Sequence, residues 1–332
     1  MSGRVSSFSR GIVSVVSGEG GTQSNEFEAA IKSVTSSTDV KAVFLYDTKN
    51  TDSDGGAWRK KTSHTSWARE ASSATRSARK DFPAMSLIVA DTSTIKVYDL
   101  DDPAMPEWLV VNEGGLNLFW SSAVPSAITA LNGRIYVATD ATTGLLTFDF
   151  ASDLCYGMRA STTGYAVGNI SERNAGNASR AGYFSAGLVN AAVNDVAATW
   201  LEGGELDSMG LVRPVVACAT DGGVSVIHPN GDVYDLSNAD SYNDHKICFF
   251  TEDGKVGTNY EASDSYDNSN AFTGLANIPF SDDTTASVNT VGSPWVEEYN
   301  DNREYGLAIT TQAYSHASAA LNAITPTSKF GL

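Results

Sequence analysis

Carboxylate pairs are the residues of this sequence most suited to chemistry, because hydrolysis of a glycosidic bond needs two carboxyl groups across a cleft. Glu202 and Glu205 lie in WLEGGELD, and Glu297 and Glu298 lie in PWVEEY, each pair close to a tryptophan. The chain holds 39 acidic residues, so neighbouring carboxylates also arise as ordinary solvated turns. We interpret both pairs as turn residues and keep a polysaccharide depolymerase only as an alternative function.

Closely spaced aspartates are a second candidate for chemistry. Asp52 and Asp54 precede two glycines, and Asp99 is followed by Asp101 and Asp102. Calcium loops use oxygen ligands at such spacings, but neither segment continues into the complete EF-hand pattern with its terminal bidentate glutamate. The histidines at positions 64, 228, 245 and 316 have no spacing typical of zinc ligands. The sequence therefore predicts turns at these places and no metal site.

Nucleophiles and cofactor motifs are the third possibility. Cys155, Cys218 and Cys248 lie far apart with mostly apolar flanks, which predicts buried free thiols. The sequence contains no G-x-S-x-G, no phosphate-binding glycine loop, no dinucleotide fingerprint and no H-E-x-x-H. We predict no enzymatic activity and no cofactor, which favours a structural or binding role.

The basic residues are unevenly placed, and one short stretch is rich in them although the chain as a whole is acidic. Lys and Arg number 22 against 39 Asp and Glu, a net charge of −17 that disfavours binding to nucleic acid. Arginine and aromatic residues are enriched where proteins bind one another. We therefore predict an interface with an acidic neighbour, the alternative being a solvated polar loop. The ten candidate residues are Trp58, Arg59, Lys60, Lys61, His64, Trp67, Arg69, Arg76, Arg79 and Lys80.

Trp67 is the aromatic residue of this stretch that we expect to be exposed, because its neighbours in SHTSWARE are uniformly polar. An exposed indole is a stacking platform for a sugar ring, whereas most tryptophans of a β-rich scaffold pack in its core. This leaves a receptor-binding module for host surface glycan as an alternative function.

Repeated pairs of short apolar runs predict the fold. Residues 87–100, 134–150 and 215–234 each read as an apolar run, an Asp/Thr/Gly turn and a second apolar run. Such hairpins are typical of meandering sheets, so we predict an all-β, propeller-like protein. The expected strands are residues 40–47, 85–90, 94–99, 108–112, 127–130, 134–138, 145–150, 196–201, 214–220, 224–228, 232–236 and 245–251.

Other segments predict less regular structure. Residues 25–33 have the pattern of a short helix, and residues 57–61 that of a strand. We expect a long loop at 63–80, an extended insertion at 161–194 and an acidic loop at 260–291, with last strands at 295–299 and 306–311. Residues 1–40 are predicted to form an attachment arm with its short helix, and residues 41–332 the propeller-like domain. The apolar patch at 12–16 is too short for a signal peptide or a membrane span, and we expect no membrane insertion.

Several short segments of the sequence resemble the pattern of one protein family. DGGAWRKKTSHTSW, ATRSARKDFPA and LIVADTSTIKVYDLDDPAMPEWLV, together with residues 194–236, resemble virion tail or appendage proteins of marine, cyanophage-like bacteriophages with an N-terminal β-propeller-like region. The family's longer members continue beyond the equivalent of Leu332, which implies an incomplete propeller or part of a longer chain. The resemblance carries over no catalytic residue.

The resemblance implies a function in assembly. It implies a non-enzymatic structural virion protein, a tail fibre or tail appendage, soluble in the host cytoplasm before assembly. Its partners would be other tail proteins and further copies of itself, arranged with closed rotational symmetry. A capsid decoration protein is a further alternative.

Overall fold

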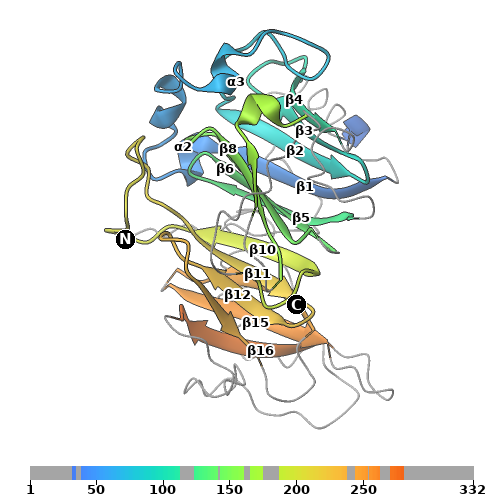
Figure 1. Ribbon diagram of the computed structural model, residues 1–332, viewed down its shortest axis with the longest axis vertical. Coiled ribbons are helices and arrows are strands. Elements are labelled where there is room, and N and C mark those ends of the chain that lie inside the picture. The colour runs from blue at the N-terminus through green and yellow to red at the C-terminus, as the bar shows by residue number, and fades with distance from the viewer. Residues whose placement is uncertain are drawn as a thin grey trace, which may run out of the picture.

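The computed structural model describes residues 32–34, 39–112, 123–140, 143–160, 165–174, 187–237, 244–252, 254–261 and 270–279. These residues form four antiparallel sheets, which we call blades 1 to 4, and a few short helices (Figure 1). In every blade the strands pair in chain order, as a meander does. The all-β, propeller-like fold predicted from the hairpins is confirmed.

Of the nine strands in the first two blades, all but β8 and β9 match predicted strands. Blade 1 contains β1 (Val40–Asp47), β2 (Met85–Asp91), β3 (Thr94–Asp99) and β4 (Glu107–Asn112). Blade 2 contains β5 (Pro125–Leu131), β6 (Arg134–Thr139), β7 (Leu145–Asp149), β8 (Leu154–Met158) and β9 (Tyr165–Gly168). Asn132 and Gly133 join β5 to β6, both with positive φ, the backbone that a two-residue hairpin turn requires.

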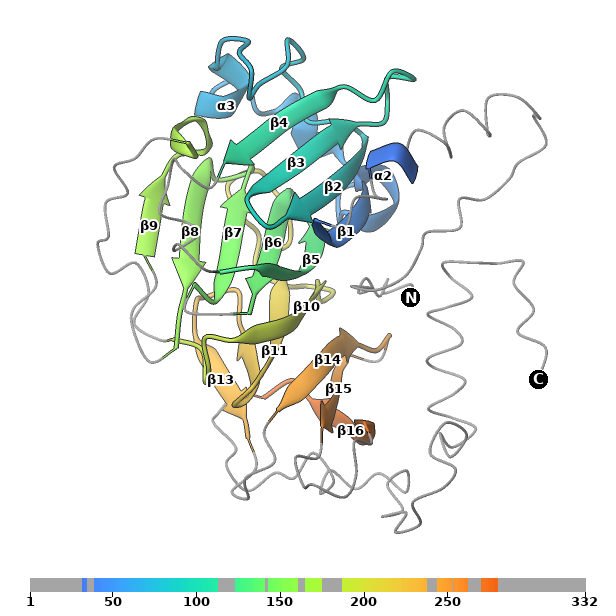
Figure 2. The same cartoon turned by 90° about the vertical axis from the view of Figure 1, so that its right-hand side faces the viewer.

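The remaining strands form the other half of the molecule. Blade 3 contains β10 (Val193–Thr199), β11 (Val215–Thr220), β12 (Gly223–Ile227) and β13 (Val233–Leu236). Blade 4 contains β14 (His245–Phe250), β15 (Lys255–Glu261) and β16 (Asn270–Asn277). Figure 2 shows blades 1 and 2 in one half and blades 3 and 4 in the other.

The blades pack through their first strands, in chain order. Extensive contacts join β1 to β5, β5 to β10 and β10 to β14, and none of comparable extent joins β14 to β1 among the described residues. Each junction holds its own cluster of buried apolar side chains: one between blades 1 and 2, one between 2 and 3, one between 3 and 4. Strands β6 and β11 are buried at every residue because they are covered on both faces. The described blades thus form an open arc.

Three predictions about irregular segments are wrong, wholly or in part, and one strand was missed. Residues 57–60 form the 3-10 helix η1 (Ala57–Lys60) and not a strand, because Trp58 and Arg59 both turn inward. The expected insertion at 161–194 contributes β9 and the 3-10 helix η2 (Ile170–Glu172). The expected acidic loop at 260–291 contributes the end of β15 and all of β16. The strand β8 was not predicted, because Leu154–Met158 lacks a β-branched run.

Parts of the sequence prediction lie outside the described residues. Residues 32–34 are helical and Val40 already belongs to β1, whereas residues 1–31 and 35–38 of the attachment arm, with most of the helix expected at 25–33, lie outside the described residues. The strands expected at 295–299 and 306–311 also lie outside the described residues. The two-part division of the chain stays a prediction.

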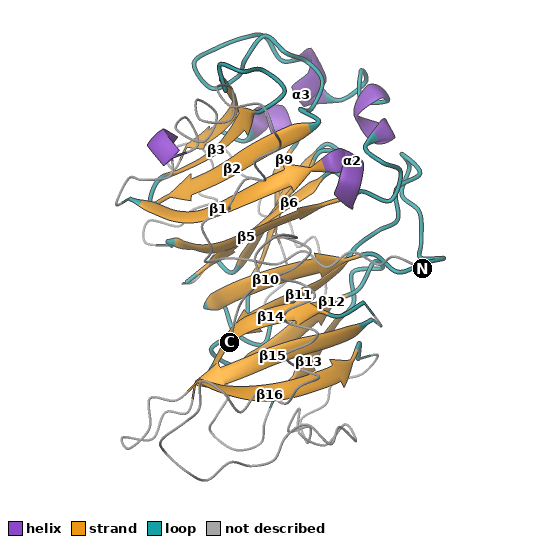
Figure 3. Ribbon diagram, turned by 180° about the vertical axis from the view of Figure 1, so that it is seen from behind, coloured by secondary structure: helices purple, strands orange, loops and turns teal. Residues whose placement is uncertain are grey.

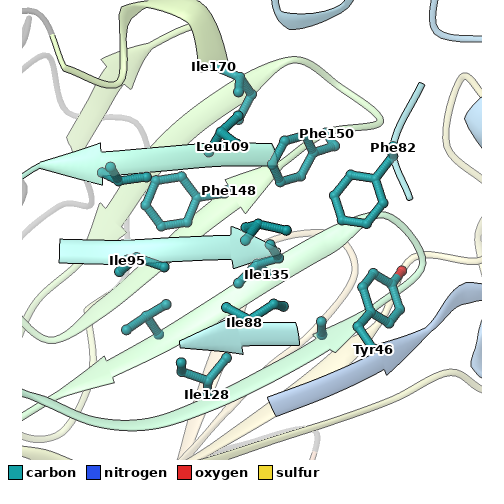
Figure 4. Close-up of a cluster of buried hydrophobic side chains, with 14 of the residues drawn as sticks. Tyr46, Phe82, Ile88, Ile95, Leu109, Ile128, Ile135, Phe148, Phe150 and Ile170 are labelled. Carbon is teal, nitrogen blue, oxygen red and sulfur yellow. The ribbon is translucent and has the colours of Figure 1, made fainter. Parts of the chain in front are cut away.

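Phe148 tests the packing between blades 1 and 2, because its ring is buried in their shared cluster (Figure 4). We expect Phe148→Ala to lower the free energy of unfolding by about 3 to 5 kcal/mol, through lost burial and the cavity left behind. Chemical denaturation measures this. Leu206→Ala is the control, because Leu206 is 60% exposed and its truncation leaves the core intact. Equal effects of the two substitutions would contradict this packing.

Candidate functional site

The segment that holds the ten predicted interface residues forms a folded cap. Residues 48–84, here called the cap, connect β1 to β2 and contain α2 (Thr48–Thr51), η1 and α3 (Ser66–Arg69). Asp47 caps α2 by accepting hydrogen bonds from the backbone N–H groups of Lys49 and Asn50. The cap lies over one end of blades 1 and 2 (Figures 1 and 3).

A close approach of backbone at the start of the cap explains one of its glycines. Gly56 has a φ of 75°, and a Cβ built there would lie 2.7 Å from the Thr48 hydroxyl oxygen. Only glycine fits both the backbone conformation and the space. The chain can then reverse from α2 into η1.

A buried carboxylate fixes the cap to blades 1 and 2. The Asp52 carboxylate accepts hydrogen bonds from the Tyr46 hydroxyl at 2.7 Å, Trp58 Nε1 at 2.7 Å and the Asn132 backbone N–H at 2.6 Å. The Tyr46 hydroxyl in turn accepts from the Gly133 backbone N–H at 2.8 Å. Burial raises the pKa of Asp52 to about 6, although the hydrogen bonds from Tyr46 and Trp58 oppose the rise.

The same network continues into blade 3. Asn132 accepts from the Ser53 backbone N–H and donates through Nδ2 to the Val212 carbonyl, both at 2.7 Å. The buried Arg134 pairs with Asp149 at 3.0 Å and with Asp207 at 2.7 Å. Val212 and Asp207 belong to the connection between β10 and β11, so blades 1, 2 and 3 meet in one buried polar network.

The β10–β11 connection also places apolar side chains under the cap. Met209 and Leu211 are buried in the cluster between blades 1 and 2, although they come from blade 3. The Asp207 carboxylate accepts from the backbone N–H groups of both residues, at 2.9 and 3.0 Å. Lys61 Nζ donates to the Met209 carbonyl at 3.0 Å. The connection is therefore held between the cap and the sheets.

A buried arginine organises the far end of the cap. The Arg76 guanidinium donates to the carbonyls of Trp67, Trp108 and Lys80 at 3.3 to 3.4 Å, and lies 4.4 Å from the centroid of the Trp108 ring. Burial lowers its pKa to about 10, against the opposing effect of Glu70. Arg76 thus joins two cap segments to β4 by charge-assisted hydrogen bonds.

Two further arginines are paired across the structure. Arg173, which follows η2 of blade 2, makes a bidentate ion pair with Glu70 of the cap at 2.7 and 3.0 Å. Arg79 pairs with Asp99 at 2.8 Å and with Asp101 at 2.6 Å, in the turn between β3 and β4. The Asp99–Asp101 turn considered as a calcium loop therefore supplies its oxygens to an arginine.

The expected exposure of Trp67 is wrong. Its side chain is 0% exposed, its Nε1 donates to the Phe150 carbonyl at 3.0 Å, and its ring meets those of Trp108 and Phe150 edge to face. Polar neighbours misled the prediction, because α3 turns a single side chain inward and leaves Ser63, His64 and Arg69 outside. An indole buried in this way cannot stack on a glycan.

The ten predicted residues thus divide into two groups. Trp58, Arg59, Trp67 and Arg76 are buried, and Arg79 is half-buried in its ion pairs. Lys60, Lys61, His64, Arg69 and Lys80 are exposed on the outer side of the cap. Several of the exposed cations also have partners within the chain: Lys60 pairs with Asp81, and Lys80 donates to the Glu70 carbonyl. The segment is thus a cap with a basic outer surface, and not a solvated loop.

The carboxylates and thiols considered for catalysis lie in different surroundings in the described part of the chain. Glu202 and Glu205 are exposed, and Glu205 lies 3.4 Å from Arg213. Burial raises the pKa of the thiols of Cys155, Cys218 and Cys248, which works against the reactive thiolate. Within the described ranges, no three His, Cys, Asp or Glu residues gather as metal ligands would. In the same part of the chain, no helix is long and apolar enough to cross a membrane.

Sequence reasoning missed the partners that hold the cap. Arg173 lies in a stretch rich in Gly, Ala, Ser and Asn, and Asp207 lies beside the more conspicuous Glu202 and Glu205. No spacing in the sequence links either residue to the cap. The dipeptide Asn132–Gly133 was a usable hairpin signal, because it stands between two apolar runs.

The four meanders, packed through their first strands in chain order, define an all-β protein of the propeller-like class. Among solved structures the chain is similar to Hsv2 of Kluyveromyces lactis, with 11% identity and a TM-score of 0.18, covering 53% of this chain and 67% of that one. It is also similar to Hsv2 of Kluyveromyces marxianus, with 14% identity and a TM-score of 0.17, covering 60% and 76%. No family model and no curated protein matches the sequence.

The pH dependence of stability tests the buried carboxylate. Because the pKa of Asp52 in the folded protein, about 6, lies above its ordinary value of 3.8, folding takes up a proton between these values. The contribution of Asp52 to stability is fully present below about pH 4 and falls as the pH rises to 6, by roughly 2 to 4 kcal/mol. We expect the difference in unfolding free energy between the wild type and Asp52→Asn to change by this amount. Urea titrations at each pH measure it.

An exposed carboxylate provides the control for that experiment. Glu202→Gln should leave the pH dependence of the unfolding free energy unchanged. A constant difference between the wild type and Asp52→Asn from pH 4 to 7 would contradict the assignment of Asp52 as the buried titrating group.

Arg76→Lys tests whether the guanidinium holds the cap. A lysine keeps the charge but cannot reach three carbonyls at once, so we expect a loss of about 2 to 4 kcal/mol in unfolding free energy. Arg69→Lys is the matched control from the exposed side of the same cap, with an expected change within about 0.5 kcal/mol. The interpretation fails if both variants have the stability of the wild type.

Proposed function

We propose that this protein is a non-enzymatic structural component of a bacteriophage particle, a tail fibre or tail appendage protein. The observation that carries the proposal is the cap, because its arginines and aromatic rings are used to join sheets to one another. Arginine and aromatic side chains that make contacts within the protein favour a structural role over a reaction centre. The assignment to a bacteriophage particle is based on the resemblance of the cap sequence and of residues 194–236 to phage tail proteins.

The outer surface of the cap is the proposed contact with a neighbouring subunit. Lys60, Lys61 and Arg69 are exposed there, on a chain whose net charge is −17. A basic patch on an acidic protein is complementary to the acidic remainder of a sister copy or of another tail protein, and charge pairing there would set orientation more than affinity. Residues 1–40 would add the attachment to the tail.

Particle association tests the proposed function. We expect the protein to remain with purified tails after the heads have been removed, detected by immunoblotting or mass spectrometry. Recovery with the heads would instead support a capsid decoration protein. Absence from both fractions would overturn the virion assignment.

Charge reversal tests the proposed contact. In phage assembled with the double variant Lys60→Glu and Arg69→Glu, we expect roughly tenfold less protein on tails, because attraction becomes repulsion. Lys41→Glu, an exposed lysine of β1 outside the cap, is the control and should assemble normally. Thermal melts must show that the double variant is folded. Wild-type incorporation of the folded double variant would remove the cap surface from the interface.

A further inference from the structure

The connection between β10 and β11, residues 200–214, forms a short hairpin that is fixed to the rest of the molecule. The Arg213 backbone N–H donates to the Glu205 carbonyl at 2.7 Å. The Asp207 N–H donates to the Leu211 carbonyl at 2.8 Å, so the two sides of the connection pair as antiparallel strands do. On its inner side, Leu211 is buried in the cluster between blades 1 and 2. The outer side of the hairpin is therefore held in a fixed position.

This outer side exposes apolar side chains with carboxylates beside them. Leu206 is 60% exposed and Leu201 is 37% exposed, and these are two of the three large apolar side chains that are exposed in the described part of the chain. Glu202 and Glu205 are exposed next to them in the sequence. Single exposed leucines are ordinary on a protein surface, whereas apolar side chains held rigidly and flanked by polar groups are typical of protein interfaces. These four residues are here called the connection surface.

The cap carries the opposite charge on its outer surface. The side chains of Lys60 and Lys61 are 69% and 52% exposed, and Arg69 is exposed as well. Long cationic side chains can cover an apolar group with their aliphatic stems while their charged ends meet carboxylates. The outer surface of the cap thus matches the connection surface in both charge and apolar character.

The two surfaces lie side by side in each molecule (Figure 1). Lys61 Nζ donates to the Met209 carbonyl at 3.0 Å, which joins the cap to the connection. Among the described residues, however, the ion pairs of the two surfaces stay within each of them: Lys60 pairs inside the cap, and Glu205 pairs with Arg213 of the connection. The opposite charges of the two surfaces are therefore not paired with each other within this part of the chain.

We propose that the outer surface of the cap of one copy docks on the connection surface of a second copy. The inference rests on the proposed function, which makes the cap surface a subunit contact, and it names the partner. Because both halves of the contact lie on the same chain, a second copy supplies a surface of the required charge. Leu206 lies against the stems of the cap cations, and Glu202 and Glu205 meet their charged ends.

Light scattering of the purified full chain tests the proposal. We expect the wild type to self-associate, and Lys60→Glu with Arg69→Glu to weaken the association about tenfold or more. Glu202→Lys with Glu205→Lys should weaken it equally. A chain with all four substitutions should associate as the wild type does, because its charges are complementary again. Lys41→Glu is the control and should also associate normally. A folded fourfold variant that does not recover association would overturn the proposal.

Photo-crosslinking tests which surfaces meet. A benzophenone amino acid at position 206 should crosslink to residues 48–84 of another chain, identified by mixing chains of light and heavy isotope composition. Because Leu206 lies outside the core, this substitution should leave the free energy of unfolding of each dilute copy unchanged. Crosslinks that form only within one chain, or that reach another chain outside the cap, would overturn the proposal.

Self-association and particle association can fail independently of each other. A protein that is monomeric even at high micromolar concentration but remains with purified tails would overturn the second copy as the partner and leave the proposed function standing. A protein that self-associates through the cap but is absent from tails and heads would overturn the virion assignment and support the contact between copies.

Discussion

The structure depends on one buried polar network where the first three blades meet. Apolar packing alone is non-directional and would allow neighbouring sheets to slide against one another. Asp52, Asn132 and Arg134 instead fix the ends of β1, β5 and β6 at hydrogen-bonding distances, and Asp207 extends the network to blade 3. Every donor and acceptor in a buried network of this kind needs a partner. Removing one group leaves a buried charge or dipole without a hydrogen bond, which lowers the stability of the fold.

The cap shows how a segment rich in basic and aromatic residues can form part of the buried core. Tryptophan rings pack together at the ends of blades 1 and 2, and Arg76 donates hydrogen bonds to the carbonyl groups of Trp67, Trp108 and Lys80 beside them. Arginine suits this place, since its planar fork donates to several acceptors and stacks on an indole. The residues that resemble a binding surface in the sequence are therefore divided by the fold into a packed interior and a basic exterior.

The sequence predicts the strands far better than it predicts the contacts between them. Runs such as RIYVAT and VVACAT are recognisable because burial on both faces demands β-branched and small residues. The edge strands β9 and β16 escaped prediction, since YAVG is only four residues long and NAFTGLAN mixes its apolar residues with Asn, Thr and Gly without strict alternation. The candidate residues were found by composition, but the burial of Trp67 and the pairing of Glu70 with Arg173 arise from residues about a hundred positions apart, which no local pattern reveals.

The cap is part of the folded core, with its tryptophans buried against blades 1 and 2. Hydrogen exchange of the tryptophan indole N–H groups, followed by NMR in the full chain, tests it most directly. We expect the Nε1–H groups of Trp58 and Trp67, which donate to Asp52 and to the Phe150 carbonyl, to exchange as slowly as the backbone amides of β6. Exchange of these two indoles at the rate of a solvent-exposed tryptophan, while β6 remains protected, would contradict it.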